Sequence, residues 1–187
     1  NFWLKNKPRA SQSPFLAQVS AQPLTAVKDA VDVFLDDVGQ VSTKDRVGVS
    51  VYNSENGFGM TECTLTEDLQ AVHEVTRTRQ AGHYQGWTNI AAGLKNARQE
   101  LEQNGRNGAS KIIVLMTDGG ANWIGGTEGG YAPDQARQEV LTEAQQCRDL
   151  QFPVVTISLG SRADLDLMEK VAEISGGVHY SIPGGVP

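Results

Sequence analysis

The spacing of apolar residues divides the chain into alternating predicted helices and strands. Where apolar side chains recur at every third or fourth position, they form one face of a helix. By this criterion we predict helices from residue 66 onward and over 24–38, 88–103, 134–150 and 165–174. Apolar runs that end at turn residues predict strands over 46–52, 60–65, 111–116, 152–159 and 178–181.

The most apolar of the predicted strands is followed by residues whose side chains could bind a ligand or take part in catalysis. Residues 112–116 have the sequence Ile-Ile-Val-Leu-Met, which is typical of a strand buried on both faces of a parallel sheet. Thr117, Asp118 and Gly119 follow directly. In open α/β sheets, ligands bind just beyond the carboxyl ends of such strands, so Thr117 and Asp118 are candidate site residues. An ordinary turn after a core strand is the alternative explanation.

Helices that alternate with apolar strands indicate an α/β protein. We predict a three-layer α/β/α sandwich with a Rossmann-like, mostly parallel sheet. The strand over 60–65 follows its predecessor across a turn-rich break, so we expect an antiparallel edge strand there. The 187 residues suit one domain, which we place at 24–187. Residues 1–23, with their prolines and serines, are predicted to form an irregular arm or insertion loop.

Composition and charge narrow the choice of function. The net charge of -6, the pI near 5.0 and the lack of a Lys/Arg cluster argue against a nucleic-acid partner. No apolar run is long enough to span a bilayer. Because the chain begins at Asn1 instead of Met, we expect it to be a processed product or an excised piece.

Two segments of the chain together resemble a known family. Residues 86–94, Gly-Trp-Thr-Asn-Ile-Ala-Ala-Gly-Leu, begin a predicted helix, and the run 112–119 ends in Thr-Asp-Gly. At this spacing the two motifs resemble the von Willebrand factor type A (vWA) domain. Further similarity is found in the helix over 24–38, the strand over 46–49 and the ending over 174–180. Within the family the chain resembles bacterial TadG-type proteins, which implies a place in the cell envelope beside pilus assembly.

The resemblance implies a metal-ion-dependent adhesion site. The family builds this site from an Asp-x-Ser-x-Ser loop after the first strand, a Thr ahead of a helix and an Asp after the central strand. Thr88 matches the second motif and Asp118 the third. They would bind Mg²⁺, or else Mn²⁺ or Ca²⁺, through a hydroxyl and a carboxylate oxygen.

The first motif of that site is missing from this chain. No Asp precedes Asp29, and the one Ser-x-Ser ahead of the first predicted helix follows Arg9 where the aspartate should stand. An arginine there would place positive charge beside the cation, so we regard this match as accidental. In the family the first strand lies between the strands over 46–52 and 111–116, and its absence would leave backbone groups unpaired. Three explanations are open: residues 2–4 supply part of this strand, another chain donates it, or the sequence is an incomplete record. We favour the last, with the missing loop upstream of Asn1, and expect weak or no metal binding by this chain alone.

On this resemblance the leading hypothesis is a protein-binding or adhesion module and not an enzyme. A cation at Thr88 and Asp118 would capture an acidic side chain of a protein partner. The full-length protein would act at the cell envelope or outside the cell, with a membrane anchor. One alternative is a Mg²⁺-dependent hydrolase that uses Asp118, although no second carboxylate or base is expected nearby. Another is a metal-free structural interaction domain, since the first motif is missing.

Aromatic residues accompany the two matching motifs. Trp87 precedes Thr88, and Trp123 lies in the segment 119–133, which carries six glycines. These tryptophans either line a partner surface or are single exposed aromatics with no special role. We expect Asn122 to cap or shape the same loop.

Other residues have plainer explanations. Asp134 begins a predicted helix and is expected to be its N-cap. His83 is expected to be a solvated loop residue. In the sheet order that the resemblance implies, Cys63 and Cys147 fall toward opposite edges, so we expect no disulfide between them.

Overall fold

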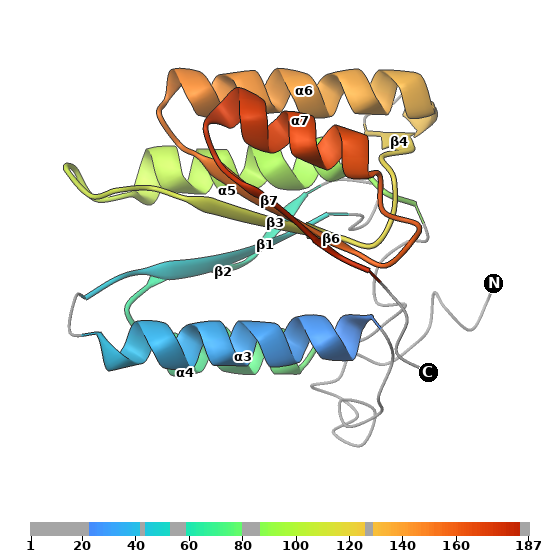
Figure 1. Ribbon diagram of the computed structural model, residues 1–187. Helices are drawn as coiled ribbons and strands as arrows, with labels where there is room; N and C mark the ends of the chain where they lie inside the picture. The colour runs from blue at the N-terminus through green and yellow to red at the C-terminus, as the bar shows by residue number, and fades with distance from the viewer. Residues whose placement is uncertain (1–22, 42–43, 53–58, 80–86, 126–128, 184–187) are drawn as a thin grey trace. The chain divides into compact units, whose positions relative to one another are not determined.

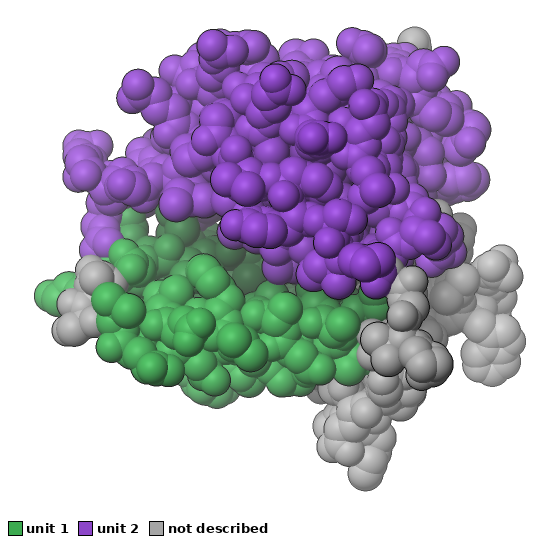
Figure 2. Space-filling model, viewed as in Figure 1, with its two compact units in different colours: residues 1–49, 62–86 green, residues 50–61, 87–187 purple. Residues whose placement is uncertain are grey.

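The computed structural model describes residues 23–41, 44–52, 59–79, 87–125 and 129–183. The chain divides into two compact units, shown in Figure 2. Residues 1–49 and 62–86 form unit 1, and residues 50–61 and 87–187 form unit 2. The arm predicted for residues 1–23 lies outside the described residues, apart from Pro23, and stays a prediction.

The elements predicted from apolar spacing are all present, with ends that differ by a few residues (Figure 1). The helices are α3 (Leu24–Gln40), α4 (Leu69–Arg77), α5 (Ile90–Asn104), α6 (Pro133–Asp149) and α7 (Leu165–Ser175). The strands are β1 (Val47–Val51), β2 (Met60–Thr66), β3 (Ile113–Thr117), β4 (Trp123–Ile124), β5 (Gly130–Tyr131), β6 (Val154–Leu159) and β7 (His179–Ile182). The antiparallel pair of β4 and β5 was not predicted, because two-residue strands leave no periodic signal.

Three helix starts (α4, α5 and α6) differ from the predictions, and those of α4 and α6 have local reasons. Helix α4 begins after Asp68, whose carboxylate accepts a hydrogen bond from the amide of Ala71 at 3.1 Å. The Asp134 prediction is wrong, because Ala132 holds the N-cap position of α6 and Pro133 begins the helix. Asp134 lies in the first helical turn instead, where its negative charge stabilises the positive end of the helix dipole.

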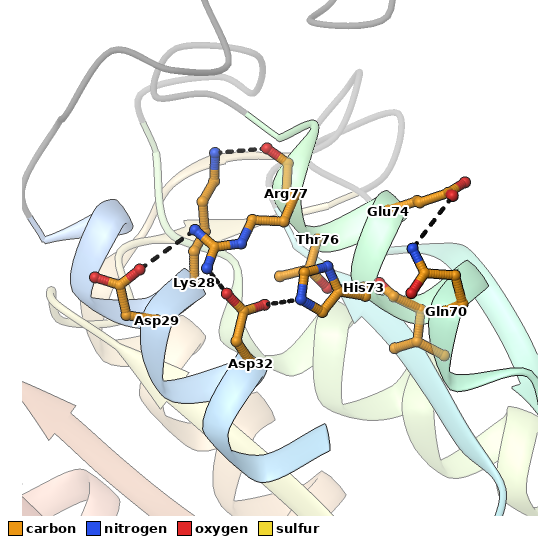
Figure 3. Close-up of polar contacts among 9 residues, drawn as sticks. Lys28, Asp29, Asp32, Gln70, His73, Glu74, Thr76 and Arg77 are labelled. Atoms are coloured by element: carbon orange, nitrogen blue, oxygen red, sulfur yellow. Dashed lines mark hydrogen bonds and ion pairs between the residues drawn. The ribbon is translucent and has the colours of Figure 1, made fainter. Parts of the chain in front are cut away.

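In unit 1, a network of charges joins α3 to α4 (Figure 3). The Asp32 carboxylate forms an ion pair with Arg77 and lies 3.0 Å from Nε2 of His73. Arg77 also approaches the exposed Asp29 at 3.3 Å, and its backbone carbonyl accepts a hydrogen bond from the buried Lys28 ammonium at 3.0 Å. Burial, and then the charge of Arg77, lower the pKa of Lys28. The spacing of Asp29 and Asp32 places both carboxylates on one side of α3, facing α4.

The two aspartates of this network give a matched test of its contribution to stability. The side chain of Asp32 is 12% exposed, whereas that of Asp29 is 62% exposed. Asp32→Ala should lower the free energy of unfolding by about 1–3 kcal/mol, because it leaves Arg77 without its sheltered partner. Asp29→Ala should cost less than about 0.5 kcal/mol, since water screens an exposed pair. Urea denaturation of both variants measures the difference, and equal losses would contradict this account.

Unit 2 is built on a parallel three-stranded sheet in the order β3-β6-β7. Helices α5 and α7 pack against this sheet, and α6 packs against both helices (Figure 1). The β3–β6 register runs from Ile113 opposite Val154 to Thr117 opposite Ser158. The buried core between helices and sheet consists mainly of Ile90, Leu94, Ile113, Leu115, Val140, Val154, Leu167, Met168 and Val171. Strand β3 ends at Thr117, directly before Asp118.

Among the described residues, β3 has a strand partner on one edge only. It pairs with β6, while β1 and β2 form a separate two-stranded sheet. The absence of the family's usual first strand stays a prediction. The strand expected at 60–65 is present as β2, which pairs with β1. None of the described helices combines the length and the apolar character needed to cross a bilayer.

A buried ion pair and a thiol lie between α5 and α6. Nε of Arg98 donates to a carboxylate oxygen of Glu143 at 3.0 Å, and both side chains are buried. Cys147, one helical turn after Glu143, is fully buried. Burial raises the pKa of the Cys147 thiol to about 12, with Arg98 lowering it and Glu143 raising it further. In the part of the chain that the structure describes, neither Cys147 nor Cys63 forms a disulfide.

The burial of Cys147 predicts unequal thiol reactivity. Disulfide reagents react with thiolates, and at neutral pH a thiol with a pKa near 12 is almost wholly protonated. In the folded protein, Ellman's reagent should therefore modify the partly exposed Cys63 and leave Cys147 untouched. Both thiols should react in denaturant. The Cys63→Ser variant isolates the second thiol, and rapid labelling of that variant in its folded state would contradict the prediction.

Candidate functional site

The candidate site begins at the turn that ends β3. Thr117 is buried, and its hydroxyl donates to the carbonyl of Gly119 at 3.0 Å and accepts from the Gly119 amide at 3.3 Å. This local exchange turns the chain sharply after the strand. The turn leaves the side chain of Asp118 49% exposed, at the carboxyl end of a parallel strand. Asp118 can thus belong both to an ordinary turn after a core strand and to a binding site.

Thr88 is held in place through its backbone. Its amide donates to Oδ1 of Asn122 at 2.7 Å, and its carbonyl accepts from the amides of Asn122 (3.0 Å) and Trp123 (3.3 Å). We call this exchange the Thr88–Asn122 clasp. Asn89, which is almost fully buried, caps α5 by accepting from the amide of Ala92 at 3.0 Å. The expectation that Asn122 shapes the loop is confirmed.

The structure brings the two sequence-predicted ligands to one place. A methyl group built on Gly119 would lie 3.6 Å from Oγ1 of Thr88. The Thr88 hydroxyl therefore lies against the turn that carries Asp118. The assignment of Thr88 and Asp118 as metal ligands stays a prediction.

Tyr52 belongs to the same region and was missed from the sequence. Its hydroxyl donates to the carbonyl of Met116 at 2.8 Å, two residues before Asp118. A methyl group on Gly93 would lie 2.8 Å from the Tyr52 ring, so a glycine is needed on α5 at this point. Burial raises the pKa of Tyr52 to about 12, a hydrogen bond with Thr117 opposes the shift, and the charge of Asp118 adds to it. Because 64 residues separate Tyr52 from Met116, no local pattern could have revealed this contact.

A cation and a second carboxylate also lie close by. Nη2 of Arg162 lies 3.6 Å from Oδ2 of Asp118, and the Arg162 side chain is 83% exposed. A methyl group on Gly120 would lie 3.9 Å from Oδ2 of Asp164, so a carboxylate approaches the residue two positions after Asp118. Asp164 is already engaged, because it accepts from the amide of Leu167 at 3.1 Å and forms an ion pair with Arg137. It serves as the N-cap of α7.

The oxygen ligands at this site are of the type that a hard cation binds, but they are too few to complete its coordination. A carboxylate and a hydroxyl are oxygen ligands that Mg²⁺ and Mn²⁺ accept. Over the part of the chain that the structure describes, no three His, Cys, Asp or Glu side chains gather at one point to hold a metal. Arg162 also competes with a cation for Asp118. The remaining oxygens of a six-coordinate ion would have to come from water, from a partner or from residues outside those described.

Comparison with known proteins decides the family. The family model for the von Willebrand factor type A domain matches residues 17–183. The chain belongs to this family. As a vWA domain it has an α/β fold with a mostly parallel sheet, as predicted. No curated protein matches the chain.

Solved structures share the vWA fold at low sequence identity. The conserved hypothetical protein BatB from Bacteroides thetaiotaomicron is 15% identical, with 91% of this chain and 85% of that chain covered and a TM-score of 0.67. An aerotolerance-related membrane protein from Bacteroides fragilis is 16% identical, with 88% and 84% covered and a TM-score of 0.66. Proximal thread matrix protein 1 from the mussel byssus, with a zinc-occupied MIDAS motif, is 22% identical, with 86% and 39% covered and a TM-score of 0.64.

The raised pKa of Tyr52 gives a direct test of the site's geometry. The unfolded chain releases a tyrosine proton near the ordinary value of about 10, whereas folded Tyr52 keeps it until about 12. The stability that the neutral phenol contributes is therefore present below pH 10 and lost as the pH rises toward 12. Absorbance at about 295 nm, compared between wild type and Tyr52→Phe, should isolate a transition near pH 12. Asp118→Asn should move this transition to lower pH, because it removes the neighbouring negative charge.

Circular dichroism on the same samples identifies the pH range in which the protein stays folded. In urea the Tyr52 transition should return to about 10. A Tyr52 transition near 10 in the folded protein would show that the hydroxyl is not held at Met116.

Proposed function

We propose that this vWA domain is a protein-binding module that uses a divalent cation at Thr88 and Asp118 to capture an acidic side chain of its partner. The observation that carries the proposal is the approach of the Thr88 hydroxyl to the turn that presents Asp118. Two oxygen donors from separate loops converge at the carboxyl end of a parallel sheet, where ligands of α/β proteins bind. Interaction through a metal site is common in vWA domains, which supports the same conclusion.

The charge of the site favours an acidic partner. Asp118 supplies one negative charge, so a bound Mg²⁺ would keep a net positive charge at the surface. The exposed Arg162 adds a second positive group at 3.6 Å from Asp118. A carboxylate from a partner protein would complete the coordination of the ion and pair with Arg162 once the ion displaces it from Asp118.

The two rival functions are less well supported. A Mg²⁺-dependent hydrolase needs a base or a second metal-binding carboxylate, and Asp164, which approaches Gly120, is occupied by Arg137 and by the cap of α7. A metal-free interaction domain is the stronger rival, because Arg162 can neutralise Asp118 without any ion. Metal titration separates this rival from the proposal.

A place in the cell envelope is part of the proposal. The fold neighbours include an aerotolerance-related membrane protein, which supports an envelope role without defining one. The narrower assignment to TadG-type proteins and pilus assembly stays a prediction from sequence resemblance, as does a membrane anchor in the full-length protein.

Calorimetric titration with MgCl₂ and MnCl₂ tests the metal site. We expect weak binding, with a Kd of about 1 mM or weaker, because this chain supplies few of the ligands. Asp118→Ala should abolish the binding heat, and Thr88→Val, which removes only the hydroxyl, should weaken binding about tenfold. A chain that carries an Asp-x-Ser-x-Ser loop ahead of Asn1 should bind more tightly by at least about tenfold.

Asp149→Ala is the matched control for loss of a carboxylate. Asp149 lies exposed at the end of α6, where it accepts a hydrogen bond from Gln145 at 3.0 Å, so its removal should leave metal binding unchanged. If Asp118→Ala and Asp149→Ala bind Mg²⁺ as wild type does, the adhesion-site assignment is wrong.

A further inference from the structure

Three aromatic rings gather beside the candidate site. Trp87 and Trp123 stack with ring centroids 4.9 Å apart and an interplanar angle of 19°. Tyr131 packs against Trp87 at 5.9 Å with a tilt of 58°. We call these three residues the aromatic wall. Trp87 is 42% exposed and Tyr131 is 65% exposed, so much of the wall is presented to solvent.

The wall is fixed before any partner arrives. Trp123 and Tyr131 are paired across the β4–β5 ladder, and the amide of Ala132 donates to the carbonyl of Asn122 at 3.0 Å. The amide of Trp123 donates to the carbonyl of Thr88 within the Thr88–Asn122 clasp. Rings that are held in this way lose little conformational entropy on binding, which favours their use as anchors.

The aromatic wall and the candidate site are connected through two adjacent residues of the chain. Trp87 is covalently joined to Thr88, whose hydroxyl lies against the Asp118 turn. Arg162, also strongly exposed, reaches Asp118 from the loop before α7. The surface therefore combines apolar aromatic area with a basic group and a candidate cation. Exposed Trp, Tyr and Arg side chains are the types most enriched among the residues that dominate binding energy at protein interfaces.

We infer that the aromatic wall is the apolar half of the partner-binding surface, and that it receives an aliphatic or aromatic side chain adjacent in sequence to the partner's acidic residue. This inference rests on the proposed function, because the acidic residue is the group that the cation and Arg162 would bind. Arg162 and a cation held at Asp118 would fix the acidic position, and the wall beside Thr88 would fix the apolar one. The partner is thus a protein segment in which an acidic and an apolar side chain occur together.

A peptide-display selection from a random library, carried out on the whole chain with MgCl₂ present, tests the inference. Wild type should enrich peptides in which Asp or Glu stands next to a large apolar residue. One enriched peptide is then synthesised and titrated against variants. Trp87→Ala should weaken its binding about 30-fold and Tyr131→Ala about fivefold, as expected for a central and a peripheral anchor.

Control variants separate binding from folding. Tyr180→Ala removes a tyrosine of similar exposure (55%) on β7, away from the aromatic wall, and should leave binding unchanged. Tyr131→Ala leaves the Trp87–Trp123 stack in place, so it tests the wall even if Trp87→Ala fails to fold. Circular dichroism and urea denaturation of each variant establish that it is folded.

The outcomes distinguish the wall from the metal site. Binding that is lost in Asp118→Ala but unchanged in Trp87→Ala and Tyr131→Ala supports the proposed function and overturns the wall. Binding that is lost in Trp87→Ala and Tyr131→Ala but unaffected by Asp118→Ala or by EDTA supports the wall as an apolar docking surface and overturns the metal-dependent function. Selection of no peptide, together with binding to a glycan array that depends on Trp87, would show that the wall recognises sugar rings and would overturn the inference.

Discussion

The Thr88–Asn122 clasp is the interaction on which the functional surface depends. One side-chain carbonyl and four backbone groups join the loop before α5 to the segment after β3. This exchange places the Thr88 hydroxyl at the Asp118 turn and holds Trp123 beside Trp87. Polar and apolar parts of the surface are consequently positioned by the same hydrogen bonds. Removing the Asn122 side chain would leave the Thr88 amide without its acceptor and loosen both parts together.

Sequence patterns anticipated the elements far better than the contacts between them. The apolar spacing of α3 and the run that forms β3 are local signals, so both elements could be predicted from neighbouring residues. Asp118 could be identified because a strand end is also a local feature. The contact of Tyr52 with Met116 and the proximity of Asp164 to Gly120 depend on how distant segments pack, and no spacing rule reports that.

Two kinds of positive charge compete for the Asp118 carboxylate. Arg162 offers it a flexible, exposed guanidinium, and a divalent ion would offer a compact charge with strict demands on geometry. The neighbouring Tyr52 phenol remains neutral at physiological pH, so it neither assists nor opposes the ion through charge. The number of further oxygen ligands therefore decides whether Asp118 binds the ion or pairs with Arg162. Each additional ligand strengthens the binding of the ion and leaves the Arg162 ion pair unaffected.

The division of the chain into units has a consequence for how the site can be isolated. Unit 2 takes residues 50–61 from one part of the sequence and residues 87–187 from another. A fragment that begins at Trp87 would retain Thr88 and Asp118 but would lack Tyr52 and the hydrogen bond that this residue gives to Met116. Strands β1 and β2 each contribute residues to both units. No single proteolytic cut therefore releases a complete unit. Dissection of this protein must therefore proceed by point substitution and not by truncation.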